Sequence, residues 1–440
     1  MAKLFKTGNY QIMEVAILVL SFLILMAIGV PIAWSIGLSS ICTMLVSIPA
    51  IPAFTTVAQR MATGLDSFAL LAIPFFVLAG QIMNKGGIAK RLIEFAKSLV
   101  GSVPGGLAHV NILAAMLFGA ISGSSVAAAS ALGSTVGKKM VEEGYSREFA
   151  AAINITSSTT GLVIPPSNVL IVYSLASGGV SIAALFIAGY IPGILTGIML
   201  MIVAAIYSKK RKFPAGEPTS FARILSSFVS AFPSLLLLVV VIGGIVAGIF
   251  TATEASAVAV LYCLVLTYFY KELSFKDIPS IFISSVETTA IVMLLIGTSM
   301  SMSWIMAYEN IPQDLTNLLL SVTDNKIIIL LIINAILLFI GIFMDMTPAV
   351  LIFTPIFLPI VTKLGINPTQ FGIIMVMNLC IGLCTPPVGA VLFVGVGIAG
   401  TTIEKVIKPL LPLFVAMIVA LLLVTYIPAL SLWLPGIFGL

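Results

Sequence analysis

Gly161-Leu162-Val163-Ile164-Pro165-Pro166 is the stretch that decides the fold, because it recurs as Gly382-Leu383-Cys384-Thr385-Pro386-Pro387. A proline has no backbone N–H and clashes with the helical turn before it, so two prolines in succession end an α-helix. Both pairs lie inside long apolar stretches, at residues 149–178 and 371–400. The repeat therefore predicts two discontinuous helices, one in each half of the chain.

A polar interruption precedes each of these breaks. Residues 106–137 are interrupted by Ile121-Ser122-Gly123-Ser124-Ser125, and residues 327–362 by Met344-Asp345-Met346-Thr347-Pro348. Each apolar stretch is too long for one crossing of a bilayer, which takes about 20 residues. The interruptions lie at nearly the same distance upstream of their proline pairs. They predict two re-entrant helical hairpins and a duplicated chain.

The composition fixes the class of protein. Of the 440 residues, 60% are hydrophobic and 8% are charged, whereas soluble domains carry about 25% charged residues. A water-soluble enzyme, a nucleic-acid binder and a disordered chain are thereby excluded. We expect an all-α polytopic membrane protein within a lipid bilayer. Further spans are predicted at residues 12–30, 31–49, 67–84, 181–207, 228–250, 251–270, 279–305 and 410–432.

Other chemistry is limited by the residue types present. His109 is the only histidine, and the four cysteines lie in apolar runs without paired spacing, so we expect neither a transition-metal site nor disulfides. The phosphate-binding sequence Gly-x-x-x-x-Gly-Lys-Ser/Thr does not occur. We expect no nucleotide cofactor, so any transport must draw on an ion gradient or on a partner.

The distribution of charge predicts the orientation of the two halves. If residues 106–137 form a hairpin, counting the crossings places on one side all of the 21 basic residues except Lys3, Lys6, Arg60, Lys326 and Lys363. The positive-inside rule makes that side cytoplasmic. The two repeats are then inverted, with both termini periplasmic, although Lys3 and Lys6 alone would favour an N-terminus inside. Lys85–Lys97 is expected to be an amphipathic cytoplasmic helix, and Asn310–Asn325 its external counterpart.

Inverted repeats with discontinuous helices are typical of secondary transporters whose site lies near the membrane midplane. Hydroxyls and free carbonyl oxygens at such a break suit a small alkali cation, and half-helix N-termini favour an anion. The alternative is that small residues only let helices pack closely, but a tip and a break that recur together favour a site. The residues predicted to contact substrate are Ser124, Asn154, Ser157, Ser158, Ser167, Asn168, Thr347 and Asn378.

Asp345 is the most informative single residue. An ionisable group at mid-depth is costly unless it is paired or solvated, and it marks a functional site by default. The alternative is a carboxylate that caps the free N–H groups of the break. No lysine or arginine is expected at its depth, so a bound cation is its natural partner. A proton on Asp345 would also relieve the charge, which leaves proton coupling open.

Several motifs, taken together, resemble a known family along almost the whole chain. They are Asp66-Ser67-Phe68, Ala72-Ile73-Pro74-Phe75-Phe76, Ser122-Gly123-Ser124-Ser125, Gly161-Leu162 with Pro165-Pro166-Ser167, Met344-Asp345 and Thr385-Pro386-Pro387. The chain resembles the large membrane subunit of tripartite ATP-independent periplasmic (TRAP) transporters, within the ion-transporter superfamily. The resemblance implies an elevator mechanism, Na⁺ coupling and the bacterial inner membrane. It also implies two partners, a small four-helix membrane subunit and a periplasmic substrate-binding protein.

The resemblance also assigns sites and domains. It implies a first Na⁺ site at Ser122, Ser125, Gly161, Ile164 and Pro166, and a second at Asp345, Thr347, Cys384, Thr385 and Val388. The transport domain would comprise residues 106–180 and 327–400, each a hairpin and a broken helix. Residues 1–105, 181–326 and 401–440 would supply the scaffold. Because the first span already starts the duplicated core, we expect the small subunit to be a separate chain.

The expected function is Na⁺-driven import of a small organic anion, such as a C4-dicarboxylate or a sialic or sugar acid, delivered by the binding protein. A second hypothesis is a stand-alone anion symporter or antiporter of the same superfamily that needs no binding protein. A third is an intramembrane enzyme. Such an enzyme needs a serine–histidine or paired-aspartate arrangement at depth, for which the sequence offers no candidate.

Overall fold

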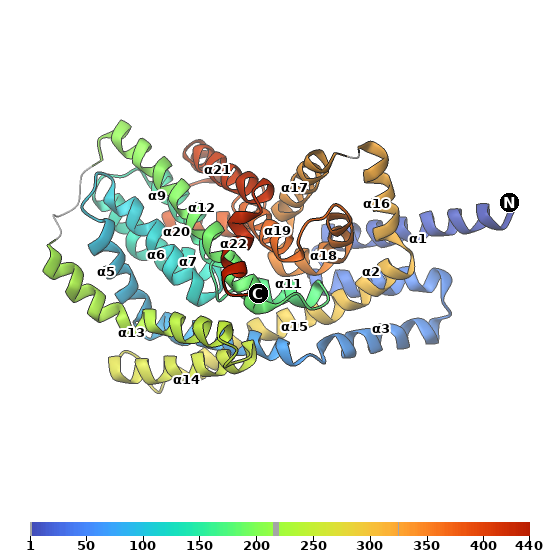
Figure 1. Cartoon of the computed structure of the whole chain (residues 1–440), viewed down its shortest axis with the longest axis horizontal. Coiled ribbons are helices and arrows are strands. Elements are labelled where there is room, and N and C mark those ends of the chain that lie inside the picture. The colour runs from blue at the N-terminus through green and yellow to red at the C-terminus, as the bar shows by residue number, and fades with distance from the viewer. Residues whose placement is uncertain (1, 214–219, 324) are drawn as a thin grey trace.

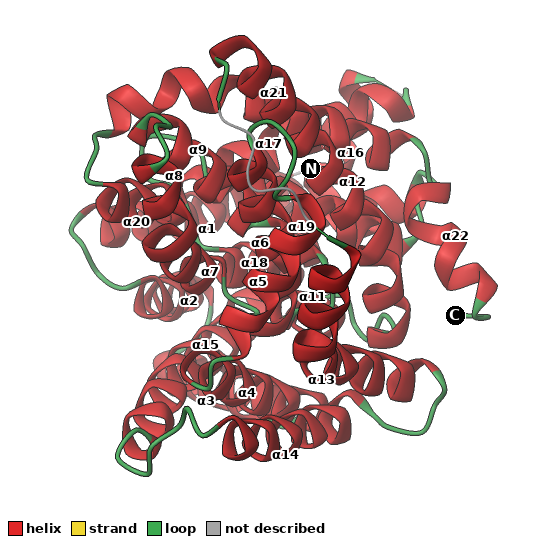
Figure 2. Ribbon diagram, turned by 90° about the vertical axis from the view of Figure 1, so that its left-hand side faces the viewer, coloured by secondary structure: helices red, strands yellow, loops and turns green. Residues whose placement is uncertain are grey.

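The computed structural model of the chain describes residues 2–213, 220–323 and 325–440. The side chains of residues 2–12, including Lys3 and Lys6, and those of residues 121, 320 and 322 lie outside the description. Within the described residues all regular structure is helical (Figure 2). Eight helices there are long and apolar enough to cross a bilayer: Phe68–Lys85, Ile182–Arg211, Phe221–Val246, Ala252–Tyr270, Ile278–Tyr308, Lys326–Phe343, Met346–Lys363 and Ile403–Tyr426. The prediction of an all-α polytopic membrane protein is confirmed.

The N-terminal spans differ from the expected ones. The spans predicted at 12–30 and 31–49 correspond to α1 (Ala2–Ala27) and α2 (Ile32–Ser47), and α2 has only 16 residues. A further helix that the sequence analysis did not predict, α3 (Ala50–Leu65), follows directly. It carries Gln59 and Arg60 among its apolar residues, so its run of hydropathy is too weak to mark a span.

Six helices form a layer on one side of the molecule, called the scaffold-like layer below. It contains α2, α3, α4 (Ala72–Lys85), α13 (Phe221–Val246), α14 (Ala252–Tyr270) and α15 (Ile278–Tyr308). Figures 1 and 2 both show α3, α13, α14 and α15 along one side of the molecule. Within this layer α15 packs against α2, α3 and α4, and α14 packs against α4. The predicted amphipathic segments are helices, α5 (Ile88–Val100) and α16 (Ile311–Val322).

Two helices are joined at each polar interruption, and each such pair is called a hairpin below. In the first, α6 (Gly106–Ser122) turns at Gly123, whose φ of +61° lies in the left-handed region that glycine adopts without strain. The chain continues through α7 (Ser125–Leu132), a π-helical turn (Gly133–Gly137) and α8 (Lys138–Glu142). The second pair is α17 (Lys326–Phe343) and α18 (Met346–Lys363), joined at Met344 and Asp345.

Both predicted breaks occur at the proline pairs. The first divides α9 (Arg147–Ser158) and α10 (Thr160–Val163) from α11 (Asn168–Ala176), and the chain bends there by 51°. The second divides α19 (Pro368–Leu383) from α20 (Ala390–Ala399). Each hairpin packs on the broken helix of its own copy, α6 on α9 and α10, and α17 and α18 on α19.

The two copies meet at equivalent positions. The Cys380 thiol donates a hydrogen bond to the carbonyl oxygen of Thr159 at 3.4 Å. Thr159 and Cys380 each stand two residues before the glycine of their own repeated stretch. The two predicted breaks therefore lie side by side and touch at equivalent positions of the repeated stretch.

Two long helices pack with the hairpins and the breaks. They are α12 (Ile182–Arg211) and α21 (Ile403–Tyr426), which pack against each other. The first also contacts α6 and α19, and the second contacts α9 and α19. The chain closes with α22 (Ala429–Ile437), so the last predicted span, 410–432, ends earlier than expected, at Tyr426.

Candidate functional site

A central cavity of about 230 Å³ lies where the two hairpin tips meet the first break. Its described lining includes six of the predicted site residues, namely Ser122, Ser124, Ser125, Asn168, Asp345 and Thr347. These residues come from α6, α7, α11 and α18 and the turns between them, which are far apart in sequence. The fold therefore gathers the tips of both copies around one space.

The scaffold-like layer supplies the other polar groups of the cavity. Gln81 and Asn84 come from the end of α4, and Thr288 comes from α15. The sequence analysis did not predict any of the three. Gln81 and Asn84 are two amides close together near the end of a predicted span, which could have marked a site. That they face the cavity depends on how the helices pack.

The first hairpin tip is held by close backbone contacts. A Cβ added at Gly80 on α4 would lie 2.9 Å from the Ser122 carbonyl oxygen, so the absence of a side chain lets α4 approach the tip. A Cβ at Gly123 would lie 3.0 Å from Asn168 Nδ2, across the cavity wall. Ser124 caps α7 by accepting a hydrogen bond from the Ala127 amide at 3.2 Å. Backbone contacts and this cap thus hold the first tip in place.

The first break offers oxygen atoms without amide partners. In an α-helix a carbonyl accepts from the amide four residues later, and Pro165 and Pro166 have no N–H to offer Gly161 and Leu162. Ser167 is fully buried, and its hydroxyl has no hydrogen-bond partner among the described residues. Carbonyl and hydroxyl oxygens of this kind coordinate Na⁺ at discontinuous helices. The residues present therefore fit a small cation.

Asp345 lies at the second tip and is exposed to the cavity. It occupies the position before α18 but makes no side-chain capping hydrogen bond there. None of the described residues that line the cavity is a lysine or an arginine. The carboxylate is therefore placed to interact with a cation or with water in the cavity.

The remaining predicted residues lie outside the cavity lining. Asn154 lines a different cavity of about 570 Å³ at the base of the first hairpin, and its Nδ2 donates to the Ala129 carbonyl at 2.8 Å. Ser158 donates to the Ile155 carbonyl within its own helix. Cys384 is fully buried, and its thiol donates to the Ile155 carbonyl of the other copy at 3.4 Å.

Other predicted positions surround the two breaks. Thr385 donates back to the Ile381 carbonyl at 2.7 Å, and Val388 is 44% exposed. Gly161, Ile164 and Pro166 are buried at the first break, next to Ser167. Their backbone oxygens, not their side chains, are the groups that a cation could use.

Each hairpin is tied to its own broken helix by a buried polar contact. Ser157 donates to Asn111 Oδ1 at 3.0 Å in the first copy, and Asn378 Nδ2 donates to Asn334 Oδ1 at 2.7 Å in the second. Ser157 and Asn378 each stand four residues before the repeated glycine. The sequence analysis predicted both as substrate contacts, and in the structure both form hydrogen bonds to the first helix of their hairpin, α6 or α17. Asn111 and Asn334, which it missed, are isolated amides in apolar runs.

Matched glycines allow the closest approach between hairpin and break. A Cβ added at Gly161 would lie 2.2 Å from the Gly119 Cα, and one at Gly382 would lie 2.5 Å from the Gly341 Cα. Both distances are too short for any real side chain. The repeated glycine is therefore required because two backbones touch at the base of each tip.

We expect Gly161→Ala to destabilise the protein, because the new methyl group meets backbone atoms that cannot rotate away. Overpacking of this kind costs about 1–3 kcal/mol. The measurement is the thermal unfolding of the purified variant in detergent. Gly397→Ala is the matched control, since this helical glycine on α20 has open space around its Cβ position. Equal stability of the two variants would contradict the backbone contact.

The comparisons with known proteins agree along most of the chain. The family model for the DctM component of tripartite ATP-independent periplasmic transporters matches residues 19–430. The chain is 56% identical over 419 residues to the uncharacterized protein YgiK of Salmonella typhimurium, covering 95% of this chain and 96% of YgiK. It is 38% identical over 440 residues to the C4-dicarboxylate TRAP transporter large permease protein DctM of Rhodobacter capsulatus, covering 97% of this chain and all of that protein (100%).

A solved structure shares the fold at low sequence identity. The YdaH transporter of Alcanivorax borkumensis superposes with a TM-score of 0.62 at 13% identity, covering 87% of this chain and 88% of that one. At this identity the similarity concerns the architecture alone. It shows that the helical arrangement described above also occurs in the YdaH transporter.

Proposed function

This chain belongs to the DctM family, the large permease component of TRAP transporters, and from that premise we propose that it imports a small organic anion with the energy of a Na⁺ gradient. Membership makes it a multi-pass bacterial membrane protein and a secondary transporter of organic acids, not an enzyme. One observation carries the finer proposal. The polar tips of both hairpins and the first break line a single cavity.

The substrate would bind in this central cavity. Ser124, Asn168 and Thr347 offer hydroxyl and amide groups to a carboxylate, but no described lining residue offers a positive charge. Asp345 adds a negative charge to the same space. A second anion is favourable there only when cations are bound beside it, so the electrostatics of the cavity couple anion binding to cation binding. A C4-dicarboxylate, a sialic acid or another sugar acid fits this description.

Two Na⁺ sites would flank the substrate. The first would use the hydroxyls of Ser122 and Ser125 with backbone oxygens of Gly161, Ile164 and Pro166. The second would lie around Asp345 and Thr347, with backbone oxygens of Cys384, Thr385 and Val388. The support at the first break is the pair of carbonyls, those of Gly161 and Leu162, that Pro165 and Pro166 leave without amide partners. At the second it is the Asp345 carboxylate, which lines the cavity together with Thr347. Bound Na⁺ would supply the positive charge that the protein side chains do not.

An elevator motion is consistent with where the cavity lies. One part of its lining comes from the two hairpins and the first broken helix. The other part comes from α4 and α15 of the scaffold-like layer. We propose residues 106–180 and 327–400 as the moving part. Because α12 and α21 pack against the hairpins and the broken helices, our proposal moves them with this part and not with the scaffold expected from sequence. The layer of α2–α4 and α13–α15 would stay fixed.

The tripartite family works with a small membrane subunit and a periplasmic binding protein. We propose that the small subunit is a separate four-helix chain and that the complex lies in the inner membrane. The test of the function is uptake of a labelled organic acid by proteoliposomes that contain both membrane chains, with the binding protein outside. Accumulation of the organic acid above its outside concentration, driven by an inward Na⁺ gradient, supports the proposal. Uptake that needs internal ATP contradicts it.

Lys138 and Lys363 would face opposite compartments, because the hairpins that they follow enter from opposite sides in the inverted topology. Both side chains are exposed. In a background without the four native cysteines, we expect an impermeant thiol reagent to label Lys363→Cys in intact cells and to spare Lys138→Cys. Labelling of Lys138→Cys only after permeabilisation is the control. Labelling of both in intact cells would refute the inverted repeats.

A further inference from the structure

A second polar pocket lies away from the central cavity, between α5 and the first turns of α13. It encloses about 350 Å³. Its described lining carries four basic side chains, two acidic ones and four serines: Lys90, Arg91, Lys97, Arg223, Glu94, Glu272, Ser98, Ser226, Ser227 and Ser230. The pocket thus has a surplus of positive charge and many hydroxyl donors, which is the chemistry that binds a phosphate group.

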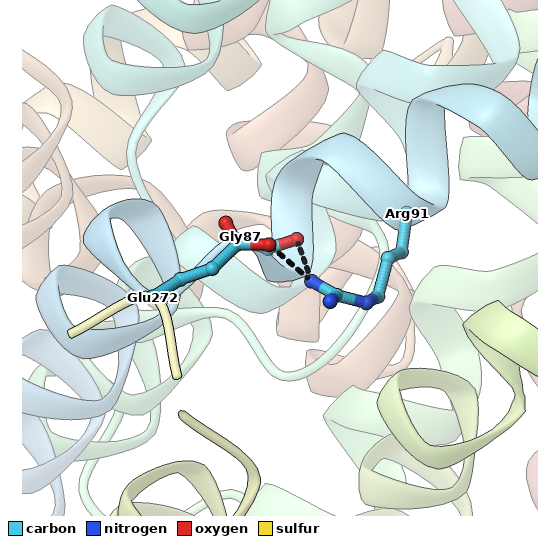
Figure 3. A network of polar contacts seen from close by, with 3 residues as sticks. All are labelled: Gly87, Arg91 and Glu272. Carbon is cyan, nitrogen blue, oxygen red and sulfur yellow. Dashed lines mark hydrogen bonds and ion pairs between the residues drawn. The ribbon is translucent and has the colours of Figure 1, made fainter. Parts of the chain in front are cut away.

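Arg91 fixes one wall of this pocket. Figure 3 shows its guanidinium bonded to Glu272 and to the Gly87 carbonyl, at 3.1 and 2.9 Å. The same group lies 3.5 Å from the centre of the Tyr270 ring. Glu272 therefore neutralises Arg91 and ties α5 to the connection that follows α14. The pocket also holds the positive charges of Lys90 and Lys97, and Glu94 is the other acidic side chain of its described lining.

Lys97 lies in an environment that is short of negative charge. Burial lowers its pKa, and so does the neighbouring ammonium group of Lys139, while Glu94 acts in the opposite direction. Arg223 lowers the pKa of Lys97 further. An anion bound among these groups would stabilise the charged form of Lys97, so the pocket favours an anionic occupant.

The pocket lies at the end of an apolar span. Its residues on α13, from Arg223 to Ser230, belong to the first turns of the span Phe221–Val246. The other side of the same turns carries exposed apolar side chains, including Leu225, Val229 and Phe232. Phe228 joins the two helices, with its ring 5.7 Å from Phe95 and 5.6 Å from Phe232. The polar pocket and the apolar surface thus adjoin at the end of a candidate membrane span, which is where we expect lipid headgroups.

We propose that this pocket binds the phosphate-bearing headgroup of an anionic phospholipid, whose acyl chains lie along the apolar side of α13. Basic pockets between membrane helices bind anionic headgroups in this way. Lys90 and Lys97 would face the phosphate. Ser227 on α13 donates to Ser98 on α5 at 2.6 Å, so this hydrogen bond ties the two helices together beside the phosphate. Because α5 connects α4 to the first hairpin, the lipid would hold this connection to α13.

The test uses the full-length chain purified in detergent and titrated with phosphatidylglycerol, with adducts counted by native mass spectrometry. We expect Lys90→Gln with Lys97→Gln to bind about 30-fold more weakly, since each basic residue near an anionic lipid contributes on the order of a fivefold effect. The matched control is Lys405→Gln with Lys408→Gln, which removes the same charge from exposed positions on α21. It should bind as the unmodified chain does.

Two further titrations distinguish a phospholipid headgroup from free phosphate as the ligand. Phosphatidylcholine should bind weakly, and millimolar inorganic phosphate should not displace phosphatidylglycerol. Displacement by inorganic phosphate would show a site for free phosphate and overturn the lipid assignment, as would equal binding by the double variant and its control. Ser230→Asp, at an exposed position of the pocket, is an independent variant if the lysine variant does not fold. It should weaken phosphatidylglycerol binding by charge repulsion, and undiminished binding would refute the proposal.

Discussion

Replacing Na⁺ by choline at fixed pH will abolish accumulation of substrate by proteoliposomes that contain the permease and its small subunit. Without bound cations, the organic anion would share the cavity with the Asp345 carboxylate and no basic side chain among the described lining residues. Choline is too large for sites built from Ser122, Ser125 and carbonyl oxygens at the first break. We therefore expect substrate binding itself, as well as the driving force, to be lost.

The size of the effect follows from the gradient. An ion that enters down a tenfold gradient releases about 1.4 kcal/mol. Two ions can sustain a roughly hundredfold accumulation of substrate if no net charge moves, because each 1.4 kcal/mol corresponds to tenfold. The measurement is the ratio of internal to external labelled substrate at steady state. Dissipating the Na⁺ gradient with an ionophore should return this ratio to one.

A proton gradient is the necessary comparison. The sequence leaves open that a proton, in place of Na⁺, neutralises Asp345 during transport. An inward proton gradient imposed in choline medium separates the two cases. Full uptake under that condition, or equal uptake in choline and in Na⁺, would overturn the Na⁺ proposal.

The breaks and the tips were predictable because their signals are local. A proline pair ends a helix wherever it occurs, and a polar run inside an apolar stretch marks a turn or a site. The structure places the turns at Gly123 and at Met344 and Asp345, and the breaks at the two proline pairs. Repetition of both features in one order made the duplication visible without any structure.

The remaining features depend on which helices touch. Gln81 and Thr288 line the cavity only because α4 packs on the first hairpin, at α6, and α15 packs on the second, at α18. Asn111 and Asn334 have a structural role only because each accepts a hydrogen bond from the broken helix packed against its hairpin. The helix α3 was missed for another reason, since its polar residues lower its hydropathy. Periodicity identifies helices, but it does not identify their neighbours.

Asp345→Asn tests the second cation site, because it keeps the shape of the side chain and removes its charge. Loss of one hydrogen-bonding or ligand contact to a charged group costs about 1.5–3 kcal/mol. That corresponds to a roughly 10- to 150-fold weaker apparent affinity for Na⁺. Folding should change little, because Asp345 makes no capping hydrogen bond to α18 and its neutral amide is easier to desolvate. The measurements are the Na⁺ activation curve of uptake and the thermal stability of the purified variant.

The structural alternative for Asp345 predicts the opposite pair of results. A capping carboxylate at the N-terminus of α18 would contribute about 0.5–2 kcal/mol to stability. Its replacement would then lower the unfolding temperature and leave the Na⁺ dependence of the folded fraction unchanged. Asp314→Asn on α16 is the control, since it makes the same chemical change outside the cavity lining. A destabilised Asp345→Asn variant with normal Na⁺ activation would therefore move the second cation site away from this tip, while weakened activation at normal stability would place a cation beside the carboxylate.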